Sequence, residues 1–154
     1  MKSAVLVTDV QTKLFDTNPR PFEADEIVKR INHVITLARA AGVPVFLIQH
    51  EVPGYLDYES EGWQLQKNLL VKNSDIRVRK TTGDAFLRTD LEEKLKSRDI
   101  TNLVVCGYAS EFCIDNTTRR ATGFGYTVQL VSDAHTQRMT RNIYQQRKSE
   151  STTI

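Results

Sequence analysis

Short apolar runs alternate along the chain with segments of helical periodicity. The runs that predict strands cover residues 4–8, 45–48, 76–80, 103–106 and 126–131, and in 76–80 the apolar side chains alternate with basic ones. Between the first two runs, residues 23–41 place apolar side chains three and four positions apart, which predicts a helix with one buried face. Gly42 and Pro44 predict the end of this helix.

Two more helices are predicted in the second half of the chain. Thr89 and Glu92 fit a capping box, and the helix that it opens would turn Leu91 and Leu95 inward. Residues 114–124 predict another helix directly after the fourth strand. Strands that alternate with helices in this way are typical of a parallel sheet that is covered on both faces. We therefore expect an α/β fold with three αβα layers and a Rossmann-like, mostly parallel sheet of five to six strands.

One long segment interrupts the alternation. Residues 49–73 show no clear period and contain Pro53, Gly54 and Gly62, so we expect an excursion over the surface. Loops of this length in compact domains are often functional. In open parallel sheets, ligands bind beyond the carboxyl ends of the strands, at the point where the strand order reverses. The residues to inspect are therefore those that follow each strand.

Composition and charge narrow the class of protein. The chain has 154 residues, which suits a single domain over 1–154, and 21 basic against 19 acidic side chains give a net charge of +2. Charges so nearly balanced do not indicate a nucleic acid or an anionic membrane as partner. No apolar run approaches the ~20 residues of a membrane span, and Asp9 interrupts the first apolar run, which is unlike a signal peptide. Two cysteines in apolar surroundings suggest reduced thiols, so we expect a cytoplasmic protein.

Cys113 is the strongest candidate for chemistry. If Ser110 caps the helix after the fourth strand, Cys113 falls in its first turn, near unpaired amides and the positive end of the helix dipole. This placement lowers the pKa of a thiol and favours the nucleophilic thiolate, and the same amides could hold an oxyanion. The alternative for Cys113 is a small buried side chain without a chemical role, and this is our interpretation of Cys106 within the strand.

Asp9 and Lys80 lie at the ends of two other strands. A carboxylate after the first strand could act as general base toward the thiol, although an aspartate that caps a loop or a helix is the commoner case. Lys80 shares a face with Ile76 and Val78, which places its ammonium at the sheet edge, where it favours an ionised Asp9 and a thiolate. A lysine that merely extends to solvent is the alternative.

Three segments in a fixed order carry a family resemblance. They are VLVTDVQ, which contains Asp9, RKTTGDAF, which contains Lys80, and VVCGYASEFCIDNTTRRATGFGYTVQLVSDAHT, which contains Cys113. Together they resemble the isochorismatase-like cysteine hydrolase superfamily over residues 4–136. The resemblance implies a three-layer αβα fold and a catalytic triad of Asp9, Lys80 and Cys113.

The resemblance also implies a cis peptide bond between Tyr108 and Ala109, and an oxyanion hole formed by the amides of Ala109 and Cys113. The chemistry that it implies is acyl transfer from a small amide, ureido or carbamoyl-type substrate. Asp9 would take the thiol proton, Cys113 would attack the carbonyl carbon, and water would hydrolyse the thioester. Lys80 would keep both groups ionised.

Three aromatic side chains and His50 bear on what the protein could bind. Phe15, Trp63 and Tyr108 are expected to wall the substrate pocket, although core packing is an equal alternative for each. Nicotinamidase-type members bind a metal through Asp-x-His and a further His. Here that place reads Gln-His-Glu around His50, so we expect no metal, and no other cofactor is indicated. His50 could still line the pocket, and a Cys–His dyad with His135 is an alternative that the family pattern does not support.

The C-terminal segment departs from the family pattern after about residue 136. A polar, basic tail, in which Met139, Ile143 and Tyr144 could face inward from a short helix, replaces the usual helix and sixth strand. The fifth strand would then be an exposed edge, so we expect a homo-oligomer, a dimer or tetramer, whose contacts cover it. The alternative to an enzyme is a non-catalytic relative that acts as a regulatory or interaction subunit.

Overall fold

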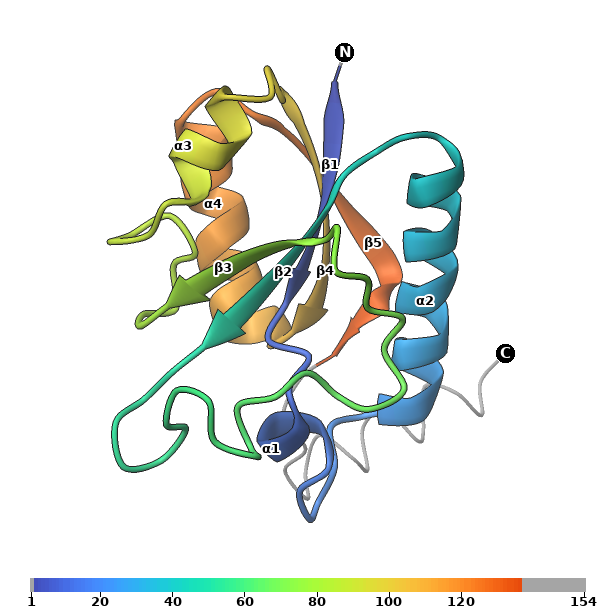
Figure 1. Ribbon diagram of the computed structural model, residues 1–154, viewed down its shortest axis with the longest axis vertical. Helices are drawn as coiled ribbons and strands as arrows, with labels where there is room; N and C mark the ends of the chain where they lie inside the picture. Colours follow the sequence, from blue (N-terminus) through green and yellow to red (C-terminus); the bar gives the residue numbers. More distant parts are fainter. Residues whose placement is uncertain (1, 137–154) are drawn as a thin grey trace.

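A five-stranded sheet forms the middle layer of the molecule (Figure 1). The computed structural model describes residues 2–136, so the helix expected around Met139, Ile143 and Tyr144 lies outside the described residues. The strands are β1 (Ser3–Thr8), β2 (Val45–His50), β3 (Ile76–Lys80), β4 (Asn102–Tyr108) and β5 (Thr127–Thr136). They lie in the order β3-β2-β1-β4-β5, and every neighbouring pair is parallel. The expected α/β fold is confirmed.

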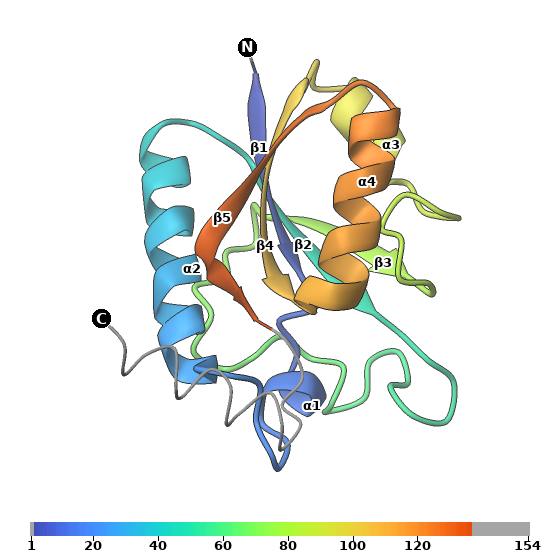
Figure 2. The ribbon, with the colours of Figure 1, turned by 180° about the vertical axis from the view of Figure 1, so that it is seen from behind.

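Helices cover both faces of the sheet (Figures 1 and 2). Helix α2 (Ala24–Ala40) lies on one face, and α3 (Leu91–Lys96) and α4 (Asp115–Gly123) lie on the other. The short helix α1 (Thr12–Phe15) lies beyond the carboxyl end of β1. None of the helices in the described range is long and apolar enough to cross a membrane.

The central strand β1 is largely apolar because it is buried on both faces. Its side chains alternate, so that Val5 and Val7 enter the core under α2, whereas Ala4 and Leu6 enter the core under α3 and α4. A strand that is buried on both faces has few positions for a polar side chain before its end. The first polar groups after β1 therefore lie at the carboxyl edge of the sheet.

Gly107 allows β4 to continue beyond the point where the sequence predicts its end. Its φ angle is +120°, and a Cβ atom at this position would lie 2.1 Å from the carbonyl oxygen of Thr8. Only glycine accepts both this backbone conformation and this close approach. As a result β1 and β4 stay paired to the register Thr8↔Gly107, and the residues that follow both strands start side by side.

The predicted capping box at the start of α3 is not formed. The hydroxyl of Thr89 donates to the carbonyl oxygen of Ala85 at 2.6 Å and accepts from the amide of Leu91 at 3.2 Å. Glu92 is instead paired with Lys96 at 2.8 Å. The Thr89 hydroxyl is thus held by the preceding loop. The helix begins at Leu91, and Leu91 is fully buried, as expected.

The excursion between β2 and β3 is more than a surface loop. It contains no helix or regular strand, but four of its own side chains, Leu56, Trp63, Gln66 and Leu69, are buried. An isolated bridge pairs Gln11 with Leu65, which holds the excursion across the carboxyl ends of β1 and β2. It therefore covers the edge of the sheet at which the candidate residues lie.

Candidate active site

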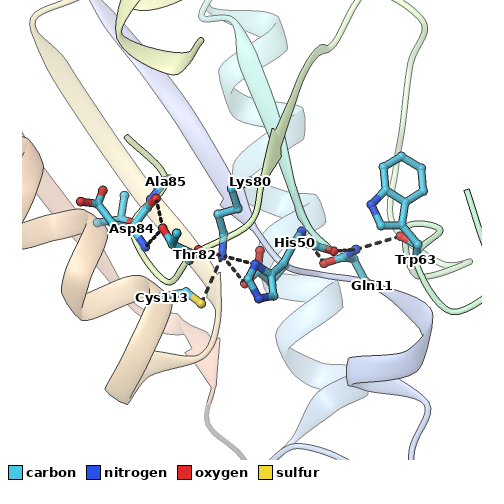
Figure 3. Close-up of polar contacts among 10 residues, drawn as sticks. Gln11, His50, Trp63, Lys80, Thr82, Asp84, Ala85 and Cys113 are labelled. Carbon is cyan, nitrogen blue, oxygen red and sulfur yellow. Dashed lines mark hydrogen bonds and ion pairs between the residues drawn. The ribbon is translucent and has the colours of Figure 1, made fainter. Parts of the chain in front are cut away.

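Asp9, Lys80 and Cys113 meet at the carboxyl edge of the sheet. The ammonium nitrogen of Lys80 lies 3.0 Å from Asp9 Oδ2 and 3.3 Å from Cys113 Sγ, as Figure 3 shows for the lysine and the cysteine. Asp9 follows β1 and Cys113 follows its neighbour β4, on either side of the position where the strand order reverses. This is the position at which open parallel sheets bind ligands.

Lys80 reaches the centre of this cluster from β3, across β2. Its side chain is 0% exposed, and it shares the buried face of β3 with Val78 while Arg77 and Arg79 face outward. The alternative of a lysine that extends to solvent is therefore wrong. A buried ammonium needs partners, and besides Asp9 and Cys113 the structure provides the carbonyl oxygen of Thr82 at 3.0 Å and His50 Nδ1 at 3.2 Å.

Asp9 has an unusual backbone conformation and one free oxygen. Its φ angle is +56°, in the left-handed region that non-glycine residues rarely adopt and that is often found at functional sites. The Asp9 amide donates to the carbonyl oxygen of Ile48 at 2.9 Å, which fixes the residue against β2. Lys80 holds Oδ2, whereas Oδ1 is buried and has no hydrogen-bond partner in the described part of the chain. Oδ1 is thus available to accept a proton.

Cys113 lies on a π-helical turn, Ser110–Ile114, that joins β4 to α4. The expectation that Ser110 caps this helix is wrong. The Ser110 hydroxyl lies 2.6 Å from His135 Nδ1 and donates to the carbonyl oxygen of Thr136 at 3.0 Å. The physical reason is that β5 continues to Thr136, beyond its predicted end, and brings these groups next to the turn.

The expected lowering of the Cys113 pKa is also wrong. Burial, followed by the charge of Asp9, raises the pKa of the Cys113 thiol to about 11, although Lys80 opposes this shift. The resting cysteine is therefore a neutral thiol at physiological pH. Burial alone raises the pKa of Cys106 to about 12, in line with the interpretation of that residue as a buried side chain inside β4.

His50 belongs to the candidate site as a neutral group. Burial and the charge of Lys80 lower the pKa of its imidazole. Because the Lys80 ammonium can only donate, the ring accepts from it at Nδ1. Within residues 2–136, no three His, Cys, Asp or Glu side chains lie close enough to hold one metal ion.

Gln11 is a site residue to which sequence reasoning gave no role. Its fully buried amide donates to the carbonyl oxygens of His50 at 3.0 Å and Trp63 at 2.9 Å, and its oxygen accepts from the His50 amide at 2.9 Å (Figure 3). It therefore fastens the excursion to the ends of β1 and β2. A polar residue two positions after Asp9 was a weak signal, because all its partners are backbone groups that only the fold brings near.

The three aromatic side chains expected to wall a pocket have different surroundings. Phe15 is 0% exposed inside the core, in line with the alternative of core packing, and its ring packs edge-on against Tyr108 at 5.9 Å. Trp63 is 9% exposed and packs edge-on against Tyr58 at 4.9 Å. Tyr108 is half-buried and does line a pocket.

The segment after Tyr108 brings Ala109 and Cys113 to the same turn. The peptide bond between Tyr108 and Ala109 is cis. The carbonyl oxygen of Ala109 accepts from the amides of Phe112 at 3.1 Å and Ile114 at 3.0 Å, which fixes the start of the π-helical turn. The two amides expected to form an oxyanion hole therefore belong to one short, hydrogen-bonded segment.

The sequence and the fold are similar to those of known proteins. The family described as Isochorismatase domain matches residues 3–148. The chain is 36% identical to a streptothricin hydrolase of Streptomyces noursei, over 86% of this chain and 49% of that protein. It is 28% identical to the ureidoacrylate amidohydrolase RutB of Pseudomonas syringae, over 70% and 57% of the two chains, so it spans about half the length of these relatives. A crystal structure of an isochorismatase family protein superimposes with a TM-score of 0.85 at 29% identity, over 88% of this chain and 81% of that one.

Proposed function

The chain belongs to the isochorismatase family, whose members are hydrolases, and from this we propose that it is a cysteine hydrolase that cleaves a C–N bond. The substrate is a small amide, ureido or carbamoyl-type compound, which forms a thioester with Cys113. The observation that carries the proposal is the buried cluster in which Lys80 Nζ lies 3.0 Å from Asp9 Oδ2 and 3.3 Å from Cys113 Sγ. A hydrolase and an amidohydrolase among the relatives support the reaction class.

The protonation states suggest the order of events. Because the Cys113 pKa is about 11, the thiol enters the reaction protonated, and Asp9 Oδ1 accepts its proton as Sγ attacks the carbonyl carbon. The amides of Ala109 and Cys113 donate to the oxyanion that forms. Asp9 returns the proton to the leaving nitrogen, and the C–N bond breaks to give an amine or ammonia and the thioester.

Hydrolysis of the thioester completes the cycle. Asp9, again unprotonated, takes a proton from water, whose oxygen attacks the thioester carbon. The C–S bond breaks, and the thiolate regains a proton from Asp9. Throughout, Lys80 offsets the negative charge that moves between the carboxylate and the sulfur.

Replacement of the nucleophile tests the proposal. We expect Cys113→Ala to lower the rate of ammonia or amine release by about 10⁴-fold or more, as loss of a catalytic nucleophile does in other hydrolases. The measurement is a panel of small amides, ureas and carbamoyl compounds, with thermal unfolding as the check that each variant is folded. Cys106→Ala is the matched control, because it removes the other thiol and leaves the site intact.

Two outcomes contradict the proposal. The first is a Cys113→Ala variant that retains the wild-type rate. The second is a folded wild-type protein that hydrolyses no member of the panel, which would indicate a non-catalytic relative.

A further inference from the structure

His50 and Lys80 are direct neighbours in the sheet. They are the last residues of β2 and β3, and they lie opposite each other in the register of this parallel pair. Residues paired in this way project their side chains to the same face of a sheet. The imidazole and the ammonium therefore meet, with His50 Nδ1 3.2 Å from Lys80 Nζ (Figure 3).

The main chain of His50 is fixed on both sides. Its amide donates to Gln11 Oε1 at 2.9 Å, and its carbonyl oxygen accepts from Gln11 Nε2 at 3.0 Å. The amide of the following residue, Glu51, donates to the carbonyl oxygen of Lys80 at 2.9 Å. The pairing of β2 with β3 is thus kept to the last residue, and a fixed backbone presents the ring to the lysine.

The acceptors around the Lys80 ammonium are of two kinds. Two of them are neutral, namely the carbonyl oxygen of Thr82 at 3.0 Å and Nδ1 of His50. The other two, Asp9 Oδ2 at 3.0 Å and Cys113 Sγ at 3.3 Å, exchange a negative charge in the proposed reaction. In the resting state the carboxylate carries this charge, because the pKa of the Cys113 thiol is about 11. After the proton transfer the sulfur carries it.

We propose that His50 positions Lys80 for the reaction. An ammonium has three N–H donors, and the two neutral acceptors take one each throughout, since neither changes its charge. The third N–H then donates to Asp9 Oδ2 in the resting state, and to the Cys113 thiolate once the thiol proton has moved to Asp9 Oδ1. The inference rests on the proposed function and adds to it a residue that acts through Lys80.

This role requires a neutral ring. An imidazole protonated on both nitrogens cannot accept at Nδ1, and it would place a second positive charge beside the ammonium. Burial, followed by the charge of Lys80, lowers the pKa of His50 from the ordinary 6.5, although the charges of Asp9 and Glu51 oppose this shift. Cys113, the other titratable group at the ammonium, is an uncharged thiol in this pH range. The resting ring is therefore neutral, with its proton on Nε2.

Two substitutions of His50 test the proposal. Leucine is similar in size but has no acceptor, whereas asparagine can place its oxygen near the position of Nδ1 and does not titrate. At pH 8, on any amide that the wild type hydrolyses, His50→Leu should lower kcat by about ten- to one-hundred-fold, because the ammonium is no longer aimed. KM should stay within about twofold, since substrate binding is not affected. His50→Asn should keep most of the wild-type kcat.

The pH profile gives a second readout, which a merely structural role would not move. Wild-type kcat should fall as the pH is lowered below 6.5 and the ring gains a proton. In His50→Asn this fall should move to lower pH. His33→Asn, at an exposed position of α2, is the matched control and should leave both kcat and the profile unchanged. Without any substrate, the ¹⁵N NMR spectrum of the His50 ring at pH 8 should show a protonated Nε2 and an unprotonated Nδ1.

Several outcomes would overturn the inference while the proposed function stands. They are a wild-type kcat in His50→Leu, a raised KM with unchanged kcat, and a ring protonated at Nδ1. If His50→Leu does not fold, the profile of His50→Asn decides, and the same acid limb as in the wild type would overturn the inference. A wild-type protein that hydrolyses no compound would contradict the proposed function itself and this inference with it.

Discussion

Lys80 is the residue on which the candidate site depends most. Its ammonium is fully buried and lies within 3.3 Å of acceptors on Asp9, His50, Thr82 and Cys113. An ammonium has three N–H donors, so these four acceptors share them. Removing one partner from a buried ion pair leaves an uncompensated charge, which is costly. Asp9 and Lys80 therefore depend on each other.

The protonation of Cys113 provides a prediction at this scale. Asp9→Asn removes a charge that raises the Cys113 pKa and leaves Lys80, which lowers it. We expect alkylation of wild-type Cys113 by iodoacetamide to accelerate with pH up to about 11. At pH 8, alkylation in Asp9→Asn should be several-fold faster than in the wild type, while amide hydrolysis is lost.

Peptide mass mapping of the alkylated protein checks this prediction. Cys106 serves as an internal control, because it is 0% exposed and should stay unmodified as long as the protein is folded. An unchanged or slower Cys113 reaction in Asp9→Asn would show that the aspartate does not control the thiol.

At the scale of the elements, the close contact of β1 and β4 determines the geometry of the site. The contact depends on Gly107, where a Cβ atom would meet the Thr8 backbone at 2.1 Å. Gly107→Ala should lower the free energy of unfolding by about 2–4 kcal/mol, since both the backbone conformation and the contact forbid a side chain. Urea denaturation measures this change.

Gly123 provides the matched control for this substitution. It lies at the end of α4, has no positive φ, and a Cβ atom there would meet nothing within 4 Å. Gly123→Ala should therefore be neutral or stabilising by up to about 1 kcal/mol. Equal losses in the two variants would show that Gly107 has no special role.

Most elements could be predicted from the sequence because their patterns are local. In β3, the alternation of Ile76, Val78 and Lys80 was enough to turn the lysine inward. The ends of β4 and β5 could not be predicted, because they depend on pairing between distant strands. Thr89 misled for a similar reason, since its hydroxyl is held by Ala85 in the preceding loop.

In the candidate site, too, some features could be predicted from the sequence and others could not. Asp9, Lys80 and Cys113 could be found because each lies at or just after the end of a strand. The direction of the Cys113 pKa could not, because it is the balance of burial and Asp9 against Lys80. The contacts of Gln11 could not be predicted from the sequence either, because its partners are backbone groups of the excursion and β2.

For the whole molecule, the free edge of β5 suggests self-association. Within residues 2–136, β5 pairs only with β4, and Leu130 on this strand is 43% exposed. We expect a dimer or tetramer at micromolar concentration in sedimentation velocity experiments, because unpaired strands are usually covered. Leu130→Lys should shift the protein toward the monomer, whereas Leu70→Lys, at a site 48% exposed on the excursion, should not. A wild-type monomer would contradict this expectation.

The central place of β1 also determines when the sheet can be completed during synthesis. Its partner β2 follows some forty residues later, but its other partner, β4, follows only after about one hundred. Such contacts between distant segments give a high contact order, which slows folding. As the chain leaves the ribosome, one edge of this buried strand must wait for residues that have not yet been translated, exposed to other chains or to a chaperone. Asp9 is made about one hundred residues before Cys113, so it gains its proposed nucleophile only once the chain between them exists.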